Sequence, residues 1–275
     1  MTLSSYYLVL ALLLPLFAAP SMAEQSYLQP KLKFCVEDTE FPPFNYFKRI
    51  DGEKGQSSGY DIDLLKLVFE PSGIEYEVIA LPWRRCLKEV SEGIIDGVMS
   101  ASLNPQRAKD YLHSDAYYFL NPSYFYLRSD FPDGLEIQAL SELESHGNIC
   151  GIKGFNYINF GWVNLTRLYE INEIAHLPTM LQKKRCRFFL ARKETLAGTL
   201  ALNHLYRFER LLGRSTVPNL RPEPFHMLIS RKSPSAELIN KLFNEKVKQL
   251  TLNGELEKLL AHHLNQLRLN AKNND

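Results

Sequence analysis

Two serines and an arginine near the end of a predicted strand could hold a carboxylate. Ser100, Ser102 and Arg107 lie at or just after the end of a short apolar run. A guanidinium offers a planar fork of N–H donors that matches a carboxylate, and hydroxyls beside it can complete the site. A lone arginine after a strand is more often a solvated surface charge. The interpretation therefore depends on the elements that position these residues.

The first part of the chain alternates predicted strands and helices. Strands are predicted at 31–36, 74–80 and 97–101, and helices at 61–69 and 83–92. This order is typical of a parallel sheet covered by helices, in which ligands bind beyond the carboxyl ends of the strands. The loop from Phe41 to Phe44 and the segment 100–107 both follow strands, so we expect them to meet there.

A second set of α/β elements follows an aromatic-rich segment at 117–127, which we expect to be an extended connector. Strands are predicted at 148–153, 187–191 and 226–230, and helices at 162–169, near Met180, at 234–250 and at 254–267. The pattern predicts two α/β lobes joined by extended crossing segments. We place lobe 1 at 24–125, with 225–275 returning to it, and lobe 2 at 126–224.

The first 23 residues have the features of a cleavable export signal. An apolar run from Tyr6 to Ala19 precedes Ser21-Met22-Ala23, whose small residues fit signal-peptidase cleavage before Glu24. A membrane anchor is the alternative, but the apolar run is short for a span. We predict a soluble periplasmic protein. Its net charge of +1 gives no general reason to expect nucleic acid or an anionic membrane as a partner.

The four cysteines favour disulfide bonds, because their number is even and the chain has an export signal. Three pairings are possible, and no C-x-x-C pair suggests zinc. If the chain forms two lobes, one bond within each lobe is the simplest arrangement. This arrangement pairs Cys35 with Cys86 and Cys150 with Cys186.

Several segments, in this order, resemble the type 2 periplasmic solute-binding proteins, specifically the family 3 group that includes polar amino-acid receptors of ABC importers. The segments are F-P-P-F (41–44), G-Y-D-I-D-L (59–64), P-W-R-R-C-L (82–87), G-I-I-D-G-V-M-S-A-S (93–102), N-P-Q-R (104–107), G-I-K-G-F-N-Y (151–157), K-R-C-R-F-F-L-A (184–191) and N-G-E-L-E-K-L-L (253–260). The resemblance covers nearly all of the chain after the signal. It implies a two-lobe clamp that closes on a small solute, with crossing strands near 119–127 and 222–229 as the hinge.

The resemblance also implies ligand contacts in the first lobe. Arg107 falls where the family has the arginine that grips an α-carboxylate. Ser102 and Ser100 fall on positions that contribute hydroxyl and backbone contacts. Phe44 or Tyr46 corresponds to aromatic residues that lie against the ligand side chain.

In the second lobe the chain departs from the amino-acid receptors. Asn156 falls where the family uses a Gly-Thr-Thr turn to complete the carboxylate site, and Phe155-Asn156 replaces that turn. Arg192 occupies the position of the aspartate that holds the ligand ammonium, with Glu194 two residues later. A cation repels an ammonium, more strongly as water is excluded. We therefore expect a carboxylate-bearing solute, either amino-acid-like or another organic anion.

Other candidate residues have structural alternatives. Trp83 and Tyr118 could stack on a ligand, and packing in the core or between the lobes is the alternative. Asp61 and Asp63 could be taken for metal ligands, but helix capping explains both, so we expect no metal. Of the basic residues at 183–193 we expect only Arg192 to point into the cleft.

The sequence therefore predicts a monomeric receptor, without a cofactor, that delivers its solute to an inner-membrane ABC permease. One alternative is an enzyme of the same fold that dehydrates cyclic carboxylic acids, for which Glu40, Glu194 or His113 could act as acid or base. Because no nucleophile elbow, phosphate loop or metal motif is present, we predict no catalysis. A periplasmic sensory protein is the other alternative, although no second spanning segment supports it.

Overall fold

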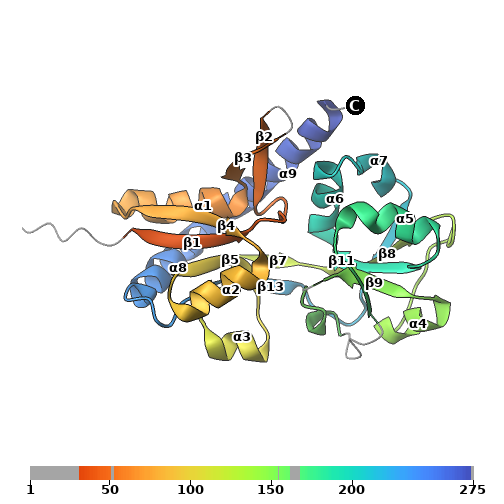
Figure 1. Ribbon diagram of the computed structural model, residues 1–275, viewed down its shortest axis with the longest axis horizontal. Coiled ribbons are helices and arrows are strands. Elements are labelled where there is room, and N and C mark those ends of the chain that lie inside the picture. Colours follow the sequence, from red (N-terminus) through yellow and green to blue (C-terminus); the bar gives the residue numbers. More distant parts are fainter. Residues whose placement is uncertain (1–30, 51–52, 154, 162–167, 274–275) are drawn as a thin grey trace, which may run out of the picture.

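The computed structural model describes residues 31–50, 53–153, 155–161 and 168–273. It consists of two α/β lobes that lie side by side, each built around its own sheet (Figure 1). This two-lobe α/β architecture is the predicted fold class. The predicted export signal at 1–23 lies outside the described residues. No described helix is long and apolar enough to span a membrane.

The first lobe contains a mixed sheet with the strand order β4-β1-β5-β13-β6, and β7 also pairs with β13. The strands are β1 (Leu32–Glu37), β4 (Tyr76–Leu81), β5 (Gly97–Ser102), β6 (Leu112–His113), β7 (Tyr118–Leu120) and β13 (Glu223–Ile229). All six residues of β5 are buried, because the strand lies between β1 and β13. Strand β13 runs antiparallel to β5 and places Phe225 opposite Ser102.

Among the described residues, five helices belong to this lobe, and a hairpin projects from it. The helices are α1 (Tyr60–Phe69), α2 (Trp83–Glu92), α3 (Pro105–Asp110), α8 (Ala236–Leu252) and α9 (Glu255–Asn273), with a 3₁₀ turn η1 (Glu70–Ser72) after α1. The hairpin pairs β2 (Tyr46–Ile50) with β3 (Glu53–Ser58), and the sequence analysis did not predict it.

The second lobe is built on a sheet with the order β10-β9-β11-β8-β12. The strands are β8 (Pro122–Leu127), β9 (Ile149–Ile152), β10 (Leu168–Ile171), β11 (Phe188–Arg192) and β12 (Leu212–Thr216). The helices are α4 (Leu143–His146), α5 (Leu177–Gln182), α6 (Lys193–Leu202) and α7 (Tyr206–Glu209), with 3₁₀ turns η2 (Leu140–Glu142), η3 (Ile158–Phe160) and η5 (Ile174–His176). Of the helix predicted at 162–169, residues 162–167 lie outside the described residues, and 168–169 belong to β10 instead.

The chain passes between the two sheets twice. It leaves the first sheet after β7 and enters the second at β8, and it returns between β12 and β13. Arg192 ends β11 opposite Pro122, at the start of β8, and Glu223 begins β13 opposite Leu120, at the end of β7. The two crossings therefore bring the end of β11 and the start of β13 to the same place between the lobes.

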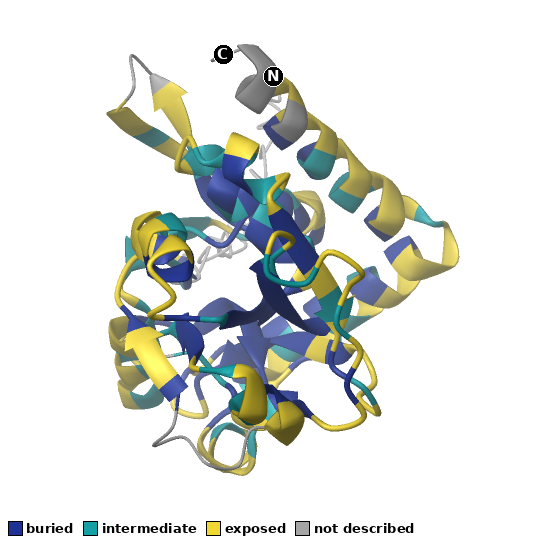
Figure 2. Ribbon diagram, turned by 90° about the vertical axis from the view of Figure 1, so that its right-hand side faces the viewer, coloured by how far each residue is buried: buried dark blue, intermediate teal, exposed yellow. Residues whose placement is uncertain are grey.

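Helix α9 contacts both lobes. It packs against α1 and α8 in the first lobe and against α6 in the second. A Cβ added at Gly198 of α6 would lie 3.3 Å from Leu267 Cδ1 of α9. Figure 2 shows buried and exposed turns alternating along this long helix, as expected for a helix with one packed face.

Each lobe contains one disulfide bond, Cys35–Cys86 in the first and Cys150–Cys186 in the second. These are the pairs that the sequence analysis expected. The first bond joins β1 to α2, and the second joins β9 to the turn before β11.

Asp61 does not cap helix α1, which corrects the sequence analysis. Gly59 occupies the N-cap position, where no side chain makes a capping hydrogen bond. Its φ of +123° and its close approach to the carbonyl of Phe44 leave no room for a side chain. Asp61 is instead fully buried and accepts hydrogen bonds from β5 and its neighbours. Asp63 does not cap the helix either. It accepts a hydrogen bond from Lys66 Nζ at 2.9 Å and contacts His263 Nε2 at 3.0 Å.

Candidate functional site

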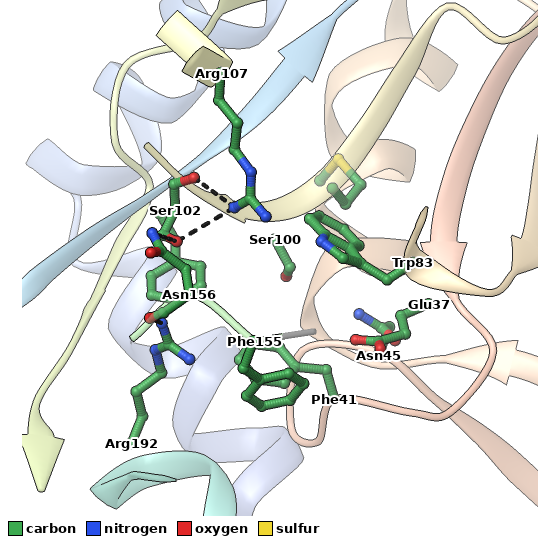
Figure 3. Close-up of a pocket in the computed structure, with 12 residues that line it drawn as sticks. Glu37, Phe41, Asn45, Trp83, Ser100, Ser102, Arg107, Phe155, Asn156 and Arg192 are labelled. Atoms are coloured by element: carbon green, nitrogen blue, oxygen red, sulfur yellow. Dashed lines mark hydrogen bonds between the residues drawn. The ribbon is translucent and has the colours of Figure 1, made fainter. Parts of the chain in front are cut away.

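A pocket lies between the two lobes, beyond the carboxyl ends of β1 and β5. Its volume is about 440 Å³, counting the open mouth. Residues of the first lobe and of the crossing strand β13 line most of it, and the ends of β9 and β11 in the second lobe complete it. The lining residues are Glu37, Phe41, Asn45, Trp83, Met99, Ser100, Ser102, Arg107, Phe155, Asn156, Arg192 and Phe225 (Figure 3).

Arg107 reaches the pocket from α3. Asn104 caps this helix by accepting a hydrogen bond from the Arg107 amide at 2.8 Å. Arg107 Nη1 donates to the Ser102 carbonyl at 2.8 Å, and the guanidinium lies 5.3 Å from the centre of the Trp83 ring. Within the described part of the chain, Nε and Nη2 have no protein acceptor. A guanidinium fixed at one nitrogen and open at the others can bind an anion.

Ser102 and Asn156 connect the two lobes beside this guanidinium. Asn156 Nδ2 donates to Ser102 Oγ at 3.3 Å, and Arg107 Nη1 lies 3.4 Å from the same oxygen. Since these contacts use the lone pairs of Ser102 Oγ, its proton can be donated to a ligand. Asn156 also accepts a hydrogen bond from Arg192 Nη2 at its carbonyl, at 3.3 Å.

Ser100 belongs to a buried hydrogen-bond network around Asp61. The Asp61 carboxylate accepts hydrogen bonds from Ser100 Oγ at 2.5 Å, Tyr117 Oη at 2.9 Å and Asn45 Nδ2 at 3.3 Å. Tyr118 Oη donates to Ser100 Oγ at 2.8 Å. Burial raises the pKa of Asp61 to about 6, although the three hydrogen bonds lower it. The Ser100 hydroxyl is therefore occupied by protein partners, and its network fixes the end of β5.

The charge of Arg192 is paired with Glu223. Arg192 Nε donates to Glu223 Oε2 at 2.7 Å and Nη2 donates to Oε1 at 3.1 Å, and both side chains are less than 5% exposed. Asn159 Nδ2 donates to the same carboxylate at 2.7 Å. The sequence analysis considered only the cation at this position, and it did not anticipate that Glu223 at the second crossing neutralises it. The guanidinium also lies over three aromatic rings, those of Phe155, Phe160 and Phe225.

Glu37 and Asn45 line the pocket, and the sequence analysis did not single them out. Glu37 ends β1, and its Oε1 accepts a hydrogen bond from Thr39 Oγ1 at 2.7 Å. Burial raises the pKa of Glu37 to about 7, and the neighbouring charge of Asp38 acts in the same direction. Asn45 is 2% exposed, and its Oδ1 has no hydrogen-bond partner among the described residues. The rule that ligands bind beyond the carboxyl ends of strands could have identified Glu37.

Three of the aromatic candidates, Phe44, Tyr46 and Tyr118, do not line the pocket. Phe44 is fully buried and stacks on Tyr118 with 3.7 Å between ring centroids. Tyr46 Oη contacts His263 Nδ1 of α9 at 3.1 Å. Phe41 lines the pocket in place of Phe44. The predicted residues that the structure brings together in the pocket are Arg107, Ser102, Ser100, Trp83, Asn156 and Arg192.

The residues considered for catalysis lie outside the pocket lining. Glu40 Oε2 forms an ion pair with Arg49 Nη2 at 2.7 Å, and His113 Nδ1 contacts the Ser114 carbonyl at 3.1 Å. Glu194 Oε2 accepts a hydrogen bond from the backbone amide of Asn121, which lies between β7 and β8. Over the described ranges, no group of three or more histidine, cysteine, aspartate or glutamate side chains could hold a metal ion.

Comparison with known proteins gives a family and a set of similar folds. The family model of bacterial extracellular solute-binding proteins, family 3, matches residues 32–266. The amino acid ABC transporter substrate-binding protein AbpA from Streptococcus pneumoniae, solved with L-arginine, has a TM-score of 0.67 and 20% identity, covering 86% of this chain and 95% of that one.

Two further solved structures have the same fold. An ancestral amino-acid-binding protein, described as a precursor of cyclohexadienyl dehydratase, has a TM-score of 0.65 and 18% identity, over 85% of this chain and 95% of that one. The ligand-binding core of GluR0, solved with L-glutamate, also has a TM-score of 0.65 and 18% identity, over 85% and 98%. No curated protein sequence matches significantly.

Proposed function

Because the chain belongs to the bacterial extracellular solute-binding proteins, family 3, we propose that it captures a small carboxylate-bearing solute between its two lobes and delivers it to an ABC importer. The proposal places the protein in the periplasm as a monomer, exported by residues 1–23, with an inner-membrane permease as its partner. A sensory partner in place of the permease would use the same pocket.

The main support for this proposal is the Arg107 guanidinium, whose Nε and Nη2 groups have no acceptor among the described residues. Arg107 is fixed by Ser102 at Nη1 and stacked on Trp83, so its free N–H groups are already oriented in the pocket. The Ser102 hydroxyl can add a further donor. A carboxylate bound there makes charge-assisted hydrogen bonds, whose contribution is roughly twice that of neutral ones. Two of the similar structures were solved with amino acids, which also carry a carboxylate.

Ligand-induced thermal stabilisation tests the proposal. Purified protein would be screened against the twenty L-amino acids, dicarboxylates and aromatic acids. A ligand at 100 times its Kd stabilises the folded state by about 2.7 kcal/mol, which raises the Tm by roughly 5–11 °C. We expect Arg107→Ala to weaken binding at least tenfold and so to remove about half of this shift or more at the same ligand concentration.

Arg85→Ala is the matched control, because Arg85 is an exposed arginine of the same lobe that pairs only with Glu89 among the described residues. This variant should bind like the wild type. If Arg107→Ala binds the solute as tightly as Arg85→Ala, the proposed carboxylate site is wrong.

The dehydratase alternative now depends on Glu37, since it is the pocket carboxyl group whose pKa lies near neutrality. A general acid needs such a pKa. Incubation with cyclic carboxylic acids, followed by mass spectrometry of the products, tests the alternative. We expect no turnover of these acids. If the wild type converts one of them and Glu37→Gln does not, catalysis would replace solute binding as the proposed function.

A further inference from the structure

The second lobe contributes a guanidinium to the pocket that the protein uses only in part. Arg192 Nε and Nη2 donate to the Glu223 carboxylate, and Nη2 also donates to the Asn156 carbonyl. In the described part of the chain, Nη1 has no acceptor. Arg192 lines the pocket, and its guanidinium lies between Asn156 and Phe155 in Figure 3. Nη1 can therefore donate a hydrogen bond to a ligand.

The orientation of this guanidinium is fixed before any ligand binds. Its central carbon lies 5.8 Å from the centre of the Phe155 ring and 5.2 Å from the centres of the Phe160 and Phe225 rings. The two hydrogen bonds to Glu223 hold it from another direction, and the Arg192 side chain is only 4% exposed. A donor that is already oriented loses little conformational freedom on binding, so a matching acceptor on the ligand increases affinity.

The ion pair disfavours an ammonium beside Nη1. Three N–H groups already donate to the Glu223 carboxylate, two from Arg192 and one from Asn159. An ammonium has donors and no lone pair, so beside Nη1 it would bring two donors together. A ligand oxygen is the group that Nη1 can bind.

The ion pair also favours a neutral oxygen at this position. Glu223 balances the charge of Arg192, and a second carboxylate here would lie close to the Glu223 carboxylate. A carbonyl or hydroxyl oxygen accepts the hydrogen bond from Nη1 without adding charge. Among the described residues no acid forms an ion pair with Arg107, so the charged group of the ligand belongs at Arg107.

We propose that Arg192 Nη1 forms a second subsite that binds a neutral oxygen of the solute, so that the preferred solute is an oxo or hydroxy carboxylic acid. The two ligand groups lie on either side of Asn156 (Figure 3). Asn156 Nδ2 donates to Ser102 Oγ beside Arg107, and the Asn156 carbonyl accepts from Arg192. This inference rests on the proposed function, because it assumes that the ligand carboxylate is held at Arg107.

Matched acids that differ in one group test the subsite. Pentanoate would be compared with 2-oxopentanoate, 4-oxopentanoate, 2-hydroxypentanoate and L-norvaline. Because aromatic rings line the pocket, 3-phenylpropanoate would also be compared with phenylpyruvate, phenyllactate and L-phenylalanine. Isothermal titration calorimetry measures each Kd. We expect an oxo or hydroxy acid of at least one set to bind at least tenfold more tightly than both the unsubstituted acid and the amino acid of that set.

Variants of the ion pair assign this preference to Arg192. Arg192→Met/Glu223→Leu removes the donor without leaving an unpaired charge, and Arg192→Lys keeps a charge beside Glu223 but removes Nη1. In both variants the tenfold ratio between the oxygen-bearing and the unsubstituted acid should fall below about threefold, because a ratio of Kd values does not depend on the stability of the fold.

Arg187→Met/Asp130→Leu is the matched control. Arg187 Nη1 lies 3.1 Å from Asp130 Oδ2 in the same lobe, and its guanidinium also lies over an aromatic ring, that of Phe131. Neither Arg187 nor Asp130 lines the pocket. This variant should keep the preference for the oxygen-bearing acid.

The outcomes separate the two proposals. If unsubstituted acids or amino acids bind as tightly as their oxo and hydroxy partners, while Arg107→Ala weakens all of them, the subsite is wrong and the proposed function stands. If the preference persists in Arg192→Met/Glu223→Leu, or is lost in Arg187→Met/Asp130→Leu, its assignment to Arg192 is wrong. Absence of binding for every acid would overturn both proposals.

Discussion

Replacement of Glu223 by glutamine tests whether the buried pair with Arg192 supports the junction of the lobes. Both side chains are less than 5% exposed and share two hydrogen bonds, of 2.7 and 3.1 Å. Glu223→Gln keeps the size of the side chain and removes its charge, so Arg192 becomes an uncompensated buried cation. Breaking a buried pair in this way costs about 3–5 kcal/mol of the free energy of unfolding. For a chain of this size that corresponds to a fall in Tm of roughly 6–20 °C.

Glu89→Gln is the control for this variant. Arg85 Nε lies 2.6 Å from Glu89 Oε1, a distance close to that of the buried pair, but the Arg85 side chain is 63% exposed. An exposed i,i+4 pair contributes about 0.5 kcal/mol or less. The two variants therefore remove ion pairs of similar donor–acceptor distance that differ in how deeply they are buried.

Urea denaturation of the two variants and of the double variant Arg192→Met/Glu223→Leu measures the effect. The double variant should recover most of the stability that Glu223→Gln loses, because no unpaired charge remains. If Glu223→Gln and Glu89→Gln lose the same free energy, or if the double variant is less stable than Glu223→Gln, the reasoning from burial is refuted.

Two further predictions concern stability. Replacing Cys150 and Cys186 by alanine should lower the free energy of unfolding by about 3–4 kcal/mol, since the bond closes a loop over a sequence separation of 36; chemical denaturation with an unchanged midpoint would contradict this. Asp61 has a pKa of about 6 in the folded protein and near 4 when unfolded, so the folded state binds the proton more tightly. The wild type should therefore lose about 2 kcal/mol relative to Asp61→Asn as the pH rises from 4 to 6. If the free energy of unfolding changes with pH in the same way in the wild type and in Asp61→Asn, this effect of Asp61 on stability is excluded.

The elements that position the site follow from local patterns in the sequence. The run from Gly97 to Ser102 is apolar enough to be a central strand, and the position of Arg107 after it indicates a polar group at the sheet edge. The environment of Arg192 could not be inferred in this way. Its partner Glu223 is 31 residues later in the chain, and only the pairing of β11 with β8 and of β13 with β7 brings them together.

The aromatic contacts show the limit of sequence analysis within a single loop. Phe41 and Phe44 are three residues apart in the same segment, and both are apolar. The backbone path of the loop places Phe41 in the pocket and Phe44 against Tyr118 in the core. Asp61 has a cap-forming residue type near a helix start, but Gly59 occupies the cap, and Asp61 meets Ser100 of β5 instead.

The position of helix α9 offers a way to measure lobe separation in solution. The helix packs on α1 and α8 of one lobe, while Leu267 lies close to Gly198 of the other, and neither of these two residues lines the pocket. Opening of the proposed clamp must change that contact. Leu269, two residues later, is 52% exposed and can carry a fluorescent dye on an introduced cysteine. A dye there would report occupancy optically, without any label in the binding site.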